Sequence, residues 1–277
     1  MVKFIDGKGI AENIVKTLKA QIKTLPEAPT LAIISYKADE RSRVYINLKL
    51  KRAEEIGIKT ELIDWSDMQQ DGCIKAMIKL GKQKNINGII VQLPLNDWYD
   101  PQALLDAIPA SKDVDGLSTQ SLENLKQNKA KLIPATPRAV LTALKHEGID
   151  LADKRIVVIG QGKLVGLPLS IILKNKGYSV ETADINTKDL AKLTKQADVL
   201  ISAAGQPNLI TGIMIKPGAT VLDVGIVEIN GKLAGDVDYE SVEPIAGMIS
   251  KVPGGIGPIT VVSLLQNVVE ASKNTSQ

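Results

Sequence analysis

The stretch that decides the fold reads Arg155-Ile-Val-Val-Ile-Gly-Gln-Gly-Lys-Leu-Val-Gly166. A β-branched strand pattern at 156–159 leads into a glycine-rich turn, helical periodicity follows over 165–176, and Gly177 ends that helix. Residues 179–182 then begin a second strand. This order is typical of dinucleotide sites, because the free N–H groups and positive dipole end at the helix start attract phosphates. We therefore predict a Rossmann-like, dinucleotide-binding domain here.

The glycines of this turn differ in what they allow. Gly160 permits the tight turn, and Gly162 lets the backbone come close to a pyrophosphate. Gly166 comes one residue later than the G-x-G-x-x-G spacing requires, so the glycines alone are a weak signal. Asp184 strengthens it, because a carboxylate at the end of the second strand can accept from a ribose 2′-hydroxyl. The alternative is an ordinary glycine-rich turn that binds nothing.

Composition excludes several classes of function. The net charge is +3, and basic residues are interspersed with acidic ones, so we expect neither a nucleic acid nor a membrane surface as a partner. Cys73 and His146 are the only cysteine and histidine, which argues against disulfides, Ser-His-Asp chemistry and a metal site. Acid–base work must fall to Lys, Tyr, Asp or Glu. Without a long apolar run or signal core, we expect a cytoplasmic protein.

Strand and helix patterns alternate along most of the chain, which predicts an α/β fold with parallel sheets in two domains. The stretch 112–137 is rich in turns, shows no strand of normal length and is typical of a domain junction. Besides the dinucleotide segment, we predict strands over 30–35, 59–65, 88–93, 199–202 and 220–224. We predict helices over 9–23, 42–56, 73–81, 102–107, 138–146 and 260–271.

Tyr45 and Lys49 form the first candidate pair for chemistry. They stand four residues apart on a predicted helix, so both project from one face. A lysine beside a phenol or in an apolar cleft has a lowered pKa and can exchange protons near neutral pH. In isolation, however, this spacing more often marks a solvated lysine beside a half-buried tyrosine.

Gln92 and Asp115 are further candidates. Gln92 interrupts a buried strand at its carboxyl end, where open α/β sheets place ligands, and its amide needs either a ligand or loop backbone as partner. Asp113 and Asp115 lie in a tight turn, where aspartate often bonds its own backbone. Asp115 can instead offer two parallel acceptors to an amino-pyrimidine ring. For Asp115 alone, the turn role is the more common one.

Together these segments resemble the bifunctional methylenetetrahydrofolate dehydrogenase/methenyltetrahydrofolate cyclohydrolase family, the FolD-type enzymes. The matches keep their order along nearly the whole chain, so the joint pattern outweighs the alternatives for each isolated motif. The matching segments are Ser42-x-x-Tyr45-x-x-x-Lys49, Val91-Gln-Leu-Pro-Leu95, Lys112-Asp-Val-Asp-Gly116, Thr136-Pro137, Val165-Gly-x-Pro168, Asp223-Val-Gly-Ile226, Gly235-Asp-Val-Asp238 and Pro253-Gly-Gly-Ile-Gly-Pro258.

The resemblance implies an architecture and an activity. It implies a folate-binding catalytic domain at 1–137 plus 261–277, an NAD(P)-binding domain at 138–260, a folate cleft between them, and a homodimer. The implied enzyme oxidises 5,10-methylenetetrahydrofolate with NAD(P) and hydrolyses the methenyl product to 10-formyltetrahydrofolate. Hydride loss leaves a methenyl cation, and a neighbouring lysine can manage the proton when water attacks that cation.

The resemblance also assigns roles to residues. Lys49 would be essential for hydrolysis, Gln92 would tune its protonation, Tyr45 would position the folate and Asp115 would anchor the pterin ring. The remaining substrate-binding residues implied are Pro253, Gly254 and Gly255. The implied cofactor-binding residues are Gly160, Gln161, Gly162, Val165, Gly166, Asp184, Ile185, Ile226 and Thr260.

Departures from the family pattern lie mostly in the cofactor site. The family usually has Gly-Arg-Ser where this chain has Gly160-Gln-Gly162, and His-Ser where it has Asp184-Ile185. The missing arginine and serines suit an adenosine 2′-phosphate, which Asp184 would repel. We therefore predict NAD as the preferred cofactor, with NADP as the alternative. Ala135 replaces a usual cysteine and Lys251 a usual proline, and the sequence accounts for neither.

Three other classes of protein share part of this pattern. A short-chain dehydrogenase also carries Y-x-x-x-K, but there the motif follows the Rossmann turn, whereas Tyr45 and Lys49 precede Gly160 by more than 100 residues. A non-catalytic folate- or nucleotide-binding relative is disfavoured because Lys49, Gln92 and Asp115 are all present. A monofunctional dehydrogenase would more naturally lack the lysine.

Overall fold

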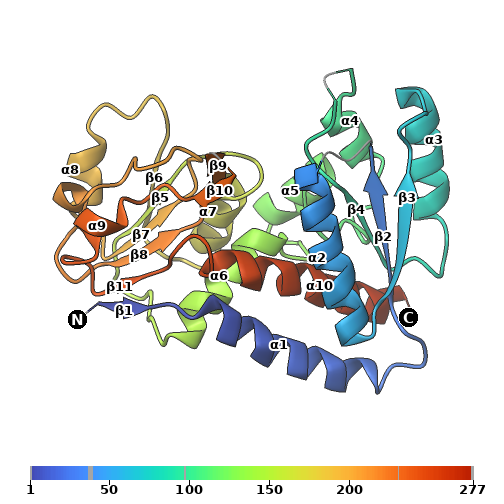
Figure 1. Cartoon of the computed structure of the whole chain (residues 1–277), viewed down its shortest axis with the longest axis horizontal. Helices are drawn as coiled ribbons and strands as arrows, with labels where there is room; N and C mark the ends of the chain where they lie inside the picture. The colour runs from blue at the N-terminus through green and yellow to red at the C-terminus, as the bar shows by residue number, and fades with distance from the viewer. Residues whose placement is uncertain (1, 37–39, 97, 230, 276–277) are drawn as a thin grey trace. The chain divides into compact units, whose positions relative to one another are not determined.

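The computed structural model describes residues 2–36, 40–96, 98–229 and 231–275 (Figure 1). The chain divides into two compact units. The three-strand unit comprises Glu12–Ala135 and Val261–Gln277, and the six-strand unit comprises Met1–Ala11 and Thr136–Thr260. Both are named for their main sheets, which are parallel, as the alternating sequence pattern predicted.

The three-strand unit is built on the strand order β3-β2-β4, with β2 (Thr30–Ser35) between β3 (Lys59–Asp64) and β4 (Gly88–Val91). Every residue of β2 and β4 is buried, which explains why their sequences are continuously apolar rather than alternating. The helices that contribute to this unit are α1 (Gly7–Ile22), α2 (Glu40–Ile56), α3 (Gln70–Gly81), α4 (Pro101–Asp106), α5 (Thr119–Lys126) and α10 (Ile256–Thr275).

The six-strand unit has the strand order β1-β11-β8-β7-β5-β6. The chain leaves β5 for β6 on one side and then returns to β7 on the other, so β5 marks the topological switch point where such sheets bind ligands. Its main strands are β1 (Lys3–Phe4), β5 (Ile156–Ile159), β6 (Val180–Ala183), β7 (Val199–Ser202), β8 (Thr220–Asp223) and β11 (Met248–Ile249).

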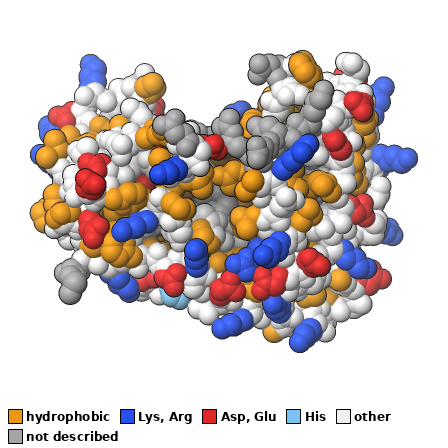
Figure 2. All heavy atoms as spheres, viewed as in Figure 1, with side chains coloured by type: hydrophobic (Ala, Val, Ile, Leu, Met, Phe, Trp, Pro, Cys, Tyr) orange, Lys and Arg blue, Asp and Glu red, His pale blue; other side chains and the backbone are white. Residues whose placement is uncertain are grey.

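Short helices and a hairpin complete the six-strand unit. The helical segments are α6 (Ala135–His146), α7 (Gly166–Asn175), α8 (Leu190–Thr194), α9 (Tyr239–Val242) and the 3₁₀ turn η1 (Gly212–Met214). The hairpin pairs β9 (Val227–Ile229) with β10 (Lys232–Ala234). On the face shown in Figure 2, basic and acidic side chains are interspersed. Among the described residues, no helix is long and apolar enough to cross a membrane.

The first strand of the chain joins the sheet of the six-strand unit. The folate-binding domain at 1–137 plus 261–277 remains a prediction, and in the structure β1 pairs with β11 through Lys3↔Met248 and Phe4↔Ile249. Met1–Ala11 therefore belong to the six-strand unit. A two-residue strand carries too little pattern to reveal its partner from the sequence.

The segment 112–137 also differs from the prediction. It contains the helix α5, which begins where the Ser118 hydroxyl accepts from the Ser121 N–H. It also contains the start of α6, at Ala135 rather than at 138. The last helix begins at Ile256, four residues before its predicted start, and the predicted strand 88–93 ends at Val91.

The glycine turn after β5 depends on close backbone contacts. Gly160 has φ +82°, and a Cβ there would overlap the backbone of Ala203. A Cβ on Gly166 would overlap the carbonyl oxygen of Gly160. A Cβ on Gly162, in contrast, would meet nothing within 4 Å. The fold thus requires glycine at 160 and 166, whereas it leaves open space at 162.

We expect Gly166→Ala to lower the free energy of unfolding by about 1–3 kcal/mol, because its methyl group has no room beside Gly160. The measurement is urea denaturation, and Gly162→Ala is the matched control, expected within about 0.5 kcal/mol of the wild type. Equal effects of the two substitutions would contradict this account of the turn.

Candidate functional site

The three-strand unit brings Lys49 and Gln92 into direct contact. Lys49 projects from α2, and its Nζ donates to Oε1 of Gln92 at 2.8 Å. Gln92 follows β4, where its N–H donates to the carbonyl of Ile34. Its Nε2 donates to the carbonyl of Leu93 at 2.7 Å, so the amide oxygen is the atom turned toward the lysine. The side-chain amide of Gln92 therefore has two partners, the candidate catalytic residue Lys49 and the backbone of the following loop.

Burial controls the ionisation of this site. Desolvation lowers the pKa of Lys49, and the nearby charge of Asp115 opposes that shift. Burial likewise raises the pKa of Asp115, with Lys49 opposing and Asp113 adding to the shift. The neutral amine of Lys49 is thereby more accessible at moderate pH than that of a solvated lysine.

Asp113, rather than Asp115, holds the turn together. Its carboxylate accepts from the N–H of Gly116 at 2.9 Å, from the N–H of Ser118 at 2.8 Å and from Oγ of Ser121 at 2.7 Å. Among the described residues, the Asp115 carboxylate forms no hydrogen bond. The turn role that is common for a lone aspartate therefore belongs to its neighbour Asp113.

The final helix anchors the same turn through a residue that sequence reasoning missed. Asn267 of α10 is fully buried, and its Nδ2 donates to the carbonyls of Val114 and Ile133, both at 2.7 Å. A buried asparagine in an otherwise apolar helix was the available signal.

Tyr45 lies one helical turn before Lys49 with 38% of its surface exposed, and no hydrogen bond described in the structure joins it to the Lys49–Gln92 pair.

In the six-strand unit, the turn after β5 lies beside the end of β6. The N–H of Gly160 donates to the carbonyl of Ala183 at 2.8 Å, which aligns the turn with Asp184. Gln161 folds back, because its Nε2 donates to the carbonyls of Gly160 at 3.1 Å and Val158 at 3.3 Å. Gln161 thus stabilises the turn from within rather than reaching outward.

Asp184 is exposed and opens a short turn. Its Oδ1 accepts from the N–H of Asn186, and its own N–H donates to Oγ1 of Thr187, both at 2.9 Å. The next residue, Ile185, is completely exposed. A fully solvated isoleucine beside an exposed carboxylate is what a site for the adenosine half of a dinucleotide would present.

The other residues of this unit that were predicted to bind the cofactor or the substrate lie in the segments that follow β5, β8 and β11, or in the first turns of α10. Val165 precedes α7, Ile226 follows β8 with 46% exposure, and 253–255 follow β11. Thr260 lies in the first turns of α10 and donates from Oγ1 to the carbonyl of Ile256.

The structure also accounts for one of the two unusual residues. The Lys251 ammonium lies 3.9 Å from the Phe4 ring centroid and 3.8 Å from the Glu243 carboxylate. It therefore connects the loop after β11 to β1. Ala135 is buried at the start of α6, and nothing further in the structure explains it.

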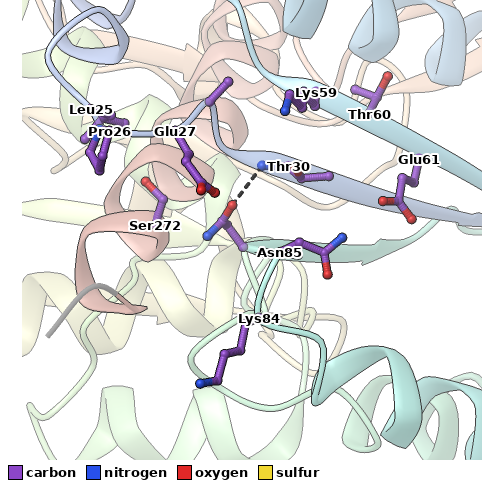
Figure 3. A pocket seen from close by; sticks show the side chains of 12 residues that line it. Leu25, Pro26, Glu27, Thr30, Lys59, Thr60, Glu61, Lys84, Asn85 and Ser272 are labelled. Atoms are coloured by element: carbon purple, nitrogen blue, oxygen red, sulfur yellow. Dashed lines mark hydrogen bonds between the residues drawn. The ribbon is translucent and has the colours of Figure 1, made fainter.

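A cavity of about 700 Å³ lies elsewhere in the three-strand unit, lined by the starts of β2 and β3 (Figure 3). Thr30 and Lys59 mark those strand starts, whereas Gln92 lies beyond the carboxyl end of β4. None of the residues that line the cavity belongs to the predicted site. Its full lining is Leu25, Pro26, Glu27, Ala28, Thr30, Lys59, Thr60, Glu61, Lys84, Asn85, Asn87 and Ser272.

Comparison with known proteins identifies the family. Residues 5–115 match the catalytic domain of tetrahydrofolate dehydrogenase/cyclohydrolase, and residues 134–276 match its NAD(P)-binding domain. The chain is 40% identical over 276 residues to the bifunctional protein FolD of Dechloromonas aromatica, covering 98% of this chain and 97% of that protein.

Two solved structures extend the likeness to three dimensions. The bifunctional FolD enzyme of Campylobacter jejuni superposes with a TM-score of 0.95 at 37% identity, covering 99% of both chains. The Trypanosoma brucei enzyme, solved with NADP and an inhibitor, has a TM-score of 0.92 at 32% identity, covering all of this chain and 99% of that one. This chain belongs to the tetrahydrofolate dehydrogenase/cyclohydrolase family.

Proposed function

We propose that this protein oxidises 5,10-methylenetetrahydrofolate with a nicotinamide dinucleotide and hydrolyses the methenyl product to 10-formyltetrahydrofolate. The observation that carries the hydrolytic half is the Lys49–Gln92 hydrogen bond beside Asp115. The glycine turn of the six-strand unit supports the oxidative half. The site residues named from the sequence are part of the same proposal.

The cofactor site uses the backbone of the glycine turn and the Asp184 carboxylate. The N–H groups at the start of α7 and the open space at Gly162 suit a pyrophosphate, and Asp184 suits a ribose hydroxyl. A bound nicotinamide dinucleotide supplies the hydride acceptor.

The three-strand unit supplies the proton chemistry. Asp115 accepts from the amino-pyrimidine edge of the pterin, and Tyr45 packs against the folate. In its neutral form, Lys49 takes a proton from the water that attacks the methenyl carbon. The resulting ammonium returns this proton to the ring nitrogen as its bond to that carbon breaks, and the added hydroxyl releases its own proton to solvent as it becomes the formyl carbonyl. Gln92 holds the Lys49 nitrogen in place through an acceptor that carries no charge, so it does not force the lysine to stay protonated.

We expect Lys49→Met to lower methenyl hydrolysis by at least about 100-fold while oxidation continues, because the proton carrier is lost. The absorbance of the methenyl product measures both steps, and the product should accumulate in this variant. Lys51→Met, on the same helix but exposed, is the matched control and should behave as the wild type. Full hydrolysis by Lys49→Met would overturn the assignment.

Gln92→Glu provides a second arm with a different readout. Hydrolysis should rise with pH as Lys49 loses its proton, and burial places this rise below the pH at which a solvated lysine titrates. A carboxylate at position 92 would stabilise the protonated form of Lys49. The increase of hydrolysis with pH would therefore occur at higher pH in Gln92→Glu than in the wild type. An unchanged pH profile would exclude Lys49 as the titrating group.

We further propose that NAD is preferred over NADP. The exposed Asp184 would repel an adenosine 2′-phosphate, because both carry negative charge. Gln161 stands where the family usually has an arginine, and its side chain is turned inward, so it offers the 2′-phosphate no positive charge. The Trypanosoma brucei relative was solved with NADP. The proposed preference for NAD therefore rests on the residues of this chain's own cofactor site and not on its relatives.

We expect kcat/KM to be at least about tenfold higher with NAD than with NADP, from like-charge repulsion at Asp184. Asp184→Asn retains an acceptor for Asn186 and removes the charge, so it should shrink this ratio severalfold. Glu240→Gln, which removes an exposed charge elsewhere in the unit, should leave it unchanged. A wild-type preference for NADP would refute the proposal.

We also propose that the protein is a homodimer. The β9–β10 hairpin exposes Ile229 by 44% and Leu233 by 37%, and a two-stranded hairpin with exposed apolar side chains is only marginally stable without a packing partner. A second copy of the chain would supply that partner.

We expect the wild type to sediment as a dimer at micromolar concentration and Ile229→Glu/Leu233→Glu to sediment as a monomer, because the new charges cannot be buried. Ile213→Glu, at another exposed isoleucine of the same unit, is the control and should leave the dimer intact. A monomeric wild type would contradict the proposal.

A further inference from the structure

Two buried carboxylates of the six-strand unit have no part in the proposed chemistry. Asp236 is fully buried and accepts three hydrogen bonds, from Oγ of Ser202 at 2.7 Å and from the N–H groups of Ala204 at 2.7 Å and Gln206 at 2.8 Å. It thereby fixes the loop that leaves β7. A buried carboxyl group with three donors is held in one position.

Asp223 forms the second half of this arrangement at the end of β8. Its Oδ1 accepts from the N–H of Asp236 at 2.9 Å, and its Oδ2 accepts from the N–H of Val237 at 3.1 Å and from the hydroxyl of Tyr239 at 2.7 Å. Burial raises the pKa of Asp223 to about 6, and its three donors show that the carboxyl oxygens act as acceptors. The two carboxylates thus join the loops after β7 and β8.

Tyr239 extends the connection to a third loop. Its hydroxyl donates to Asp223 and accepts from the N–H of Val252 at 2.7 Å, and it also lies 3.2 Å from the carbonyl of Ser250. Burial raises the pKa of this hydroxyl, so the proton it donates is retained. A phenol between a buried carboxylate and a backbone amide is a directional tether, which we call the Tyr239 tether.

The loop that receives this tether, 252–255, has little regular structure of its own. It follows β11, Gly254 has φ +108°, and the N–H of Gly255 donates to the carbonyl of Lys251 at 2.7 Å. Parallel sheets bind ligands beyond the carboxyl ends of their strands, which is where this loop begins. Because glycine has more backbone freedom than other residues, an external anchor favours a single conformation of a loop that contains two glycines.

We propose that Tyr239 is a positioning residue, which holds the 252–255 loop through the Val252 amide in the conformation that receives the folate substrate. This rests on the proposed function. Tyr239 itself does not touch the reacting atoms. Loss of the Tyr239 hydroxyl should raise the KM for the folate and leave the KM for the dinucleotide unchanged. The reason is that no hydrogen bond described for the tether reaches the glycine turn or Asp184.

Tyr239→Phe tests the proposal, because it keeps the ring packing and removes only the hydroxyl. We expect the KM for 5,10-methylenetetrahydrofolate to rise roughly 2- to 10-fold, because the substitution removes one or two hydrogen bonds that hold the loop. The KM for NAD should change less than about twofold. In the unliganded protein, hydrogen exchange at the Val252 amide should accelerate by a factor similar to the rise in the folate KM. Tyr178→Phe, another tyrosine of this unit, should change none of these values.

The outcomes separate the tether from the proposed function. Unchanged exchange at Val252 would overturn the tether, and faster exchange with an unchanged folate KM would overturn its positioning role. A parallel rise in both KM values would indicate a general structural loss and also overturn the proposal. If the wild type fails to oxidise the folate, the proposed function fails and the loop's folate role with it, while the exchange rate still decides whether Tyr239 holds the loop.

Discussion

Parallel strand direction is the constraint on which the rest of this protein depends. In a parallel sheet the carboxyl ends of the strands meet at one edge, so residues far apart in sequence gather there. In the three-strand unit this places Gln92 after β4. In the six-strand unit it places the Gly160 turn after β5, Asp184 after β6 and Asp223 at the end of β8.

Neighbouring carboxylates serve different purposes in both units. Asp113 accepts from backbone and hydroxyl donors and builds a turn, whereas the charge of Asp115 raises the pKa of Lys49 against the effect of burial. Asp223 and Asp236 are likewise saturated and fasten loops. The number of donors around each carboxylate, rather than its burial alone, separates a structural aspartate from one available for chemistry.

Sequence reasoning located the fully buried strands well, and it located the helix ends and the shortest elements poorly. The fully buried strands β2, β5 and β7 agree with their predicted limits, because continuous apolar runs bounded by turns are strong local signals. The helix α5 is short and polar, and β1 has two residues, so neither carried a readable pattern. In the candidate site, Gln92 was recognised as an anomalous buried amide, whereas Asn267 was missed. Asp236 lies in a matched segment, but nothing in the sequence indicated its hydrogen bonds or those of Tyr239.

The sequence by itself determined the fold class, the dinucleotide turn and the family, because hydrophobic periodicity, glycine spacing and ordered motifs are properties of the linear chain. Only the tertiary structure decided which atoms pair. Lys49 reaches Gln92 across 43 residues, and Asn267 reaches Val114 across 153. It also decided that Asp113 builds the turn and that Tyr239 tethers Val252. Such choices depend on distances and burial in three dimensions, which no local pattern encodes.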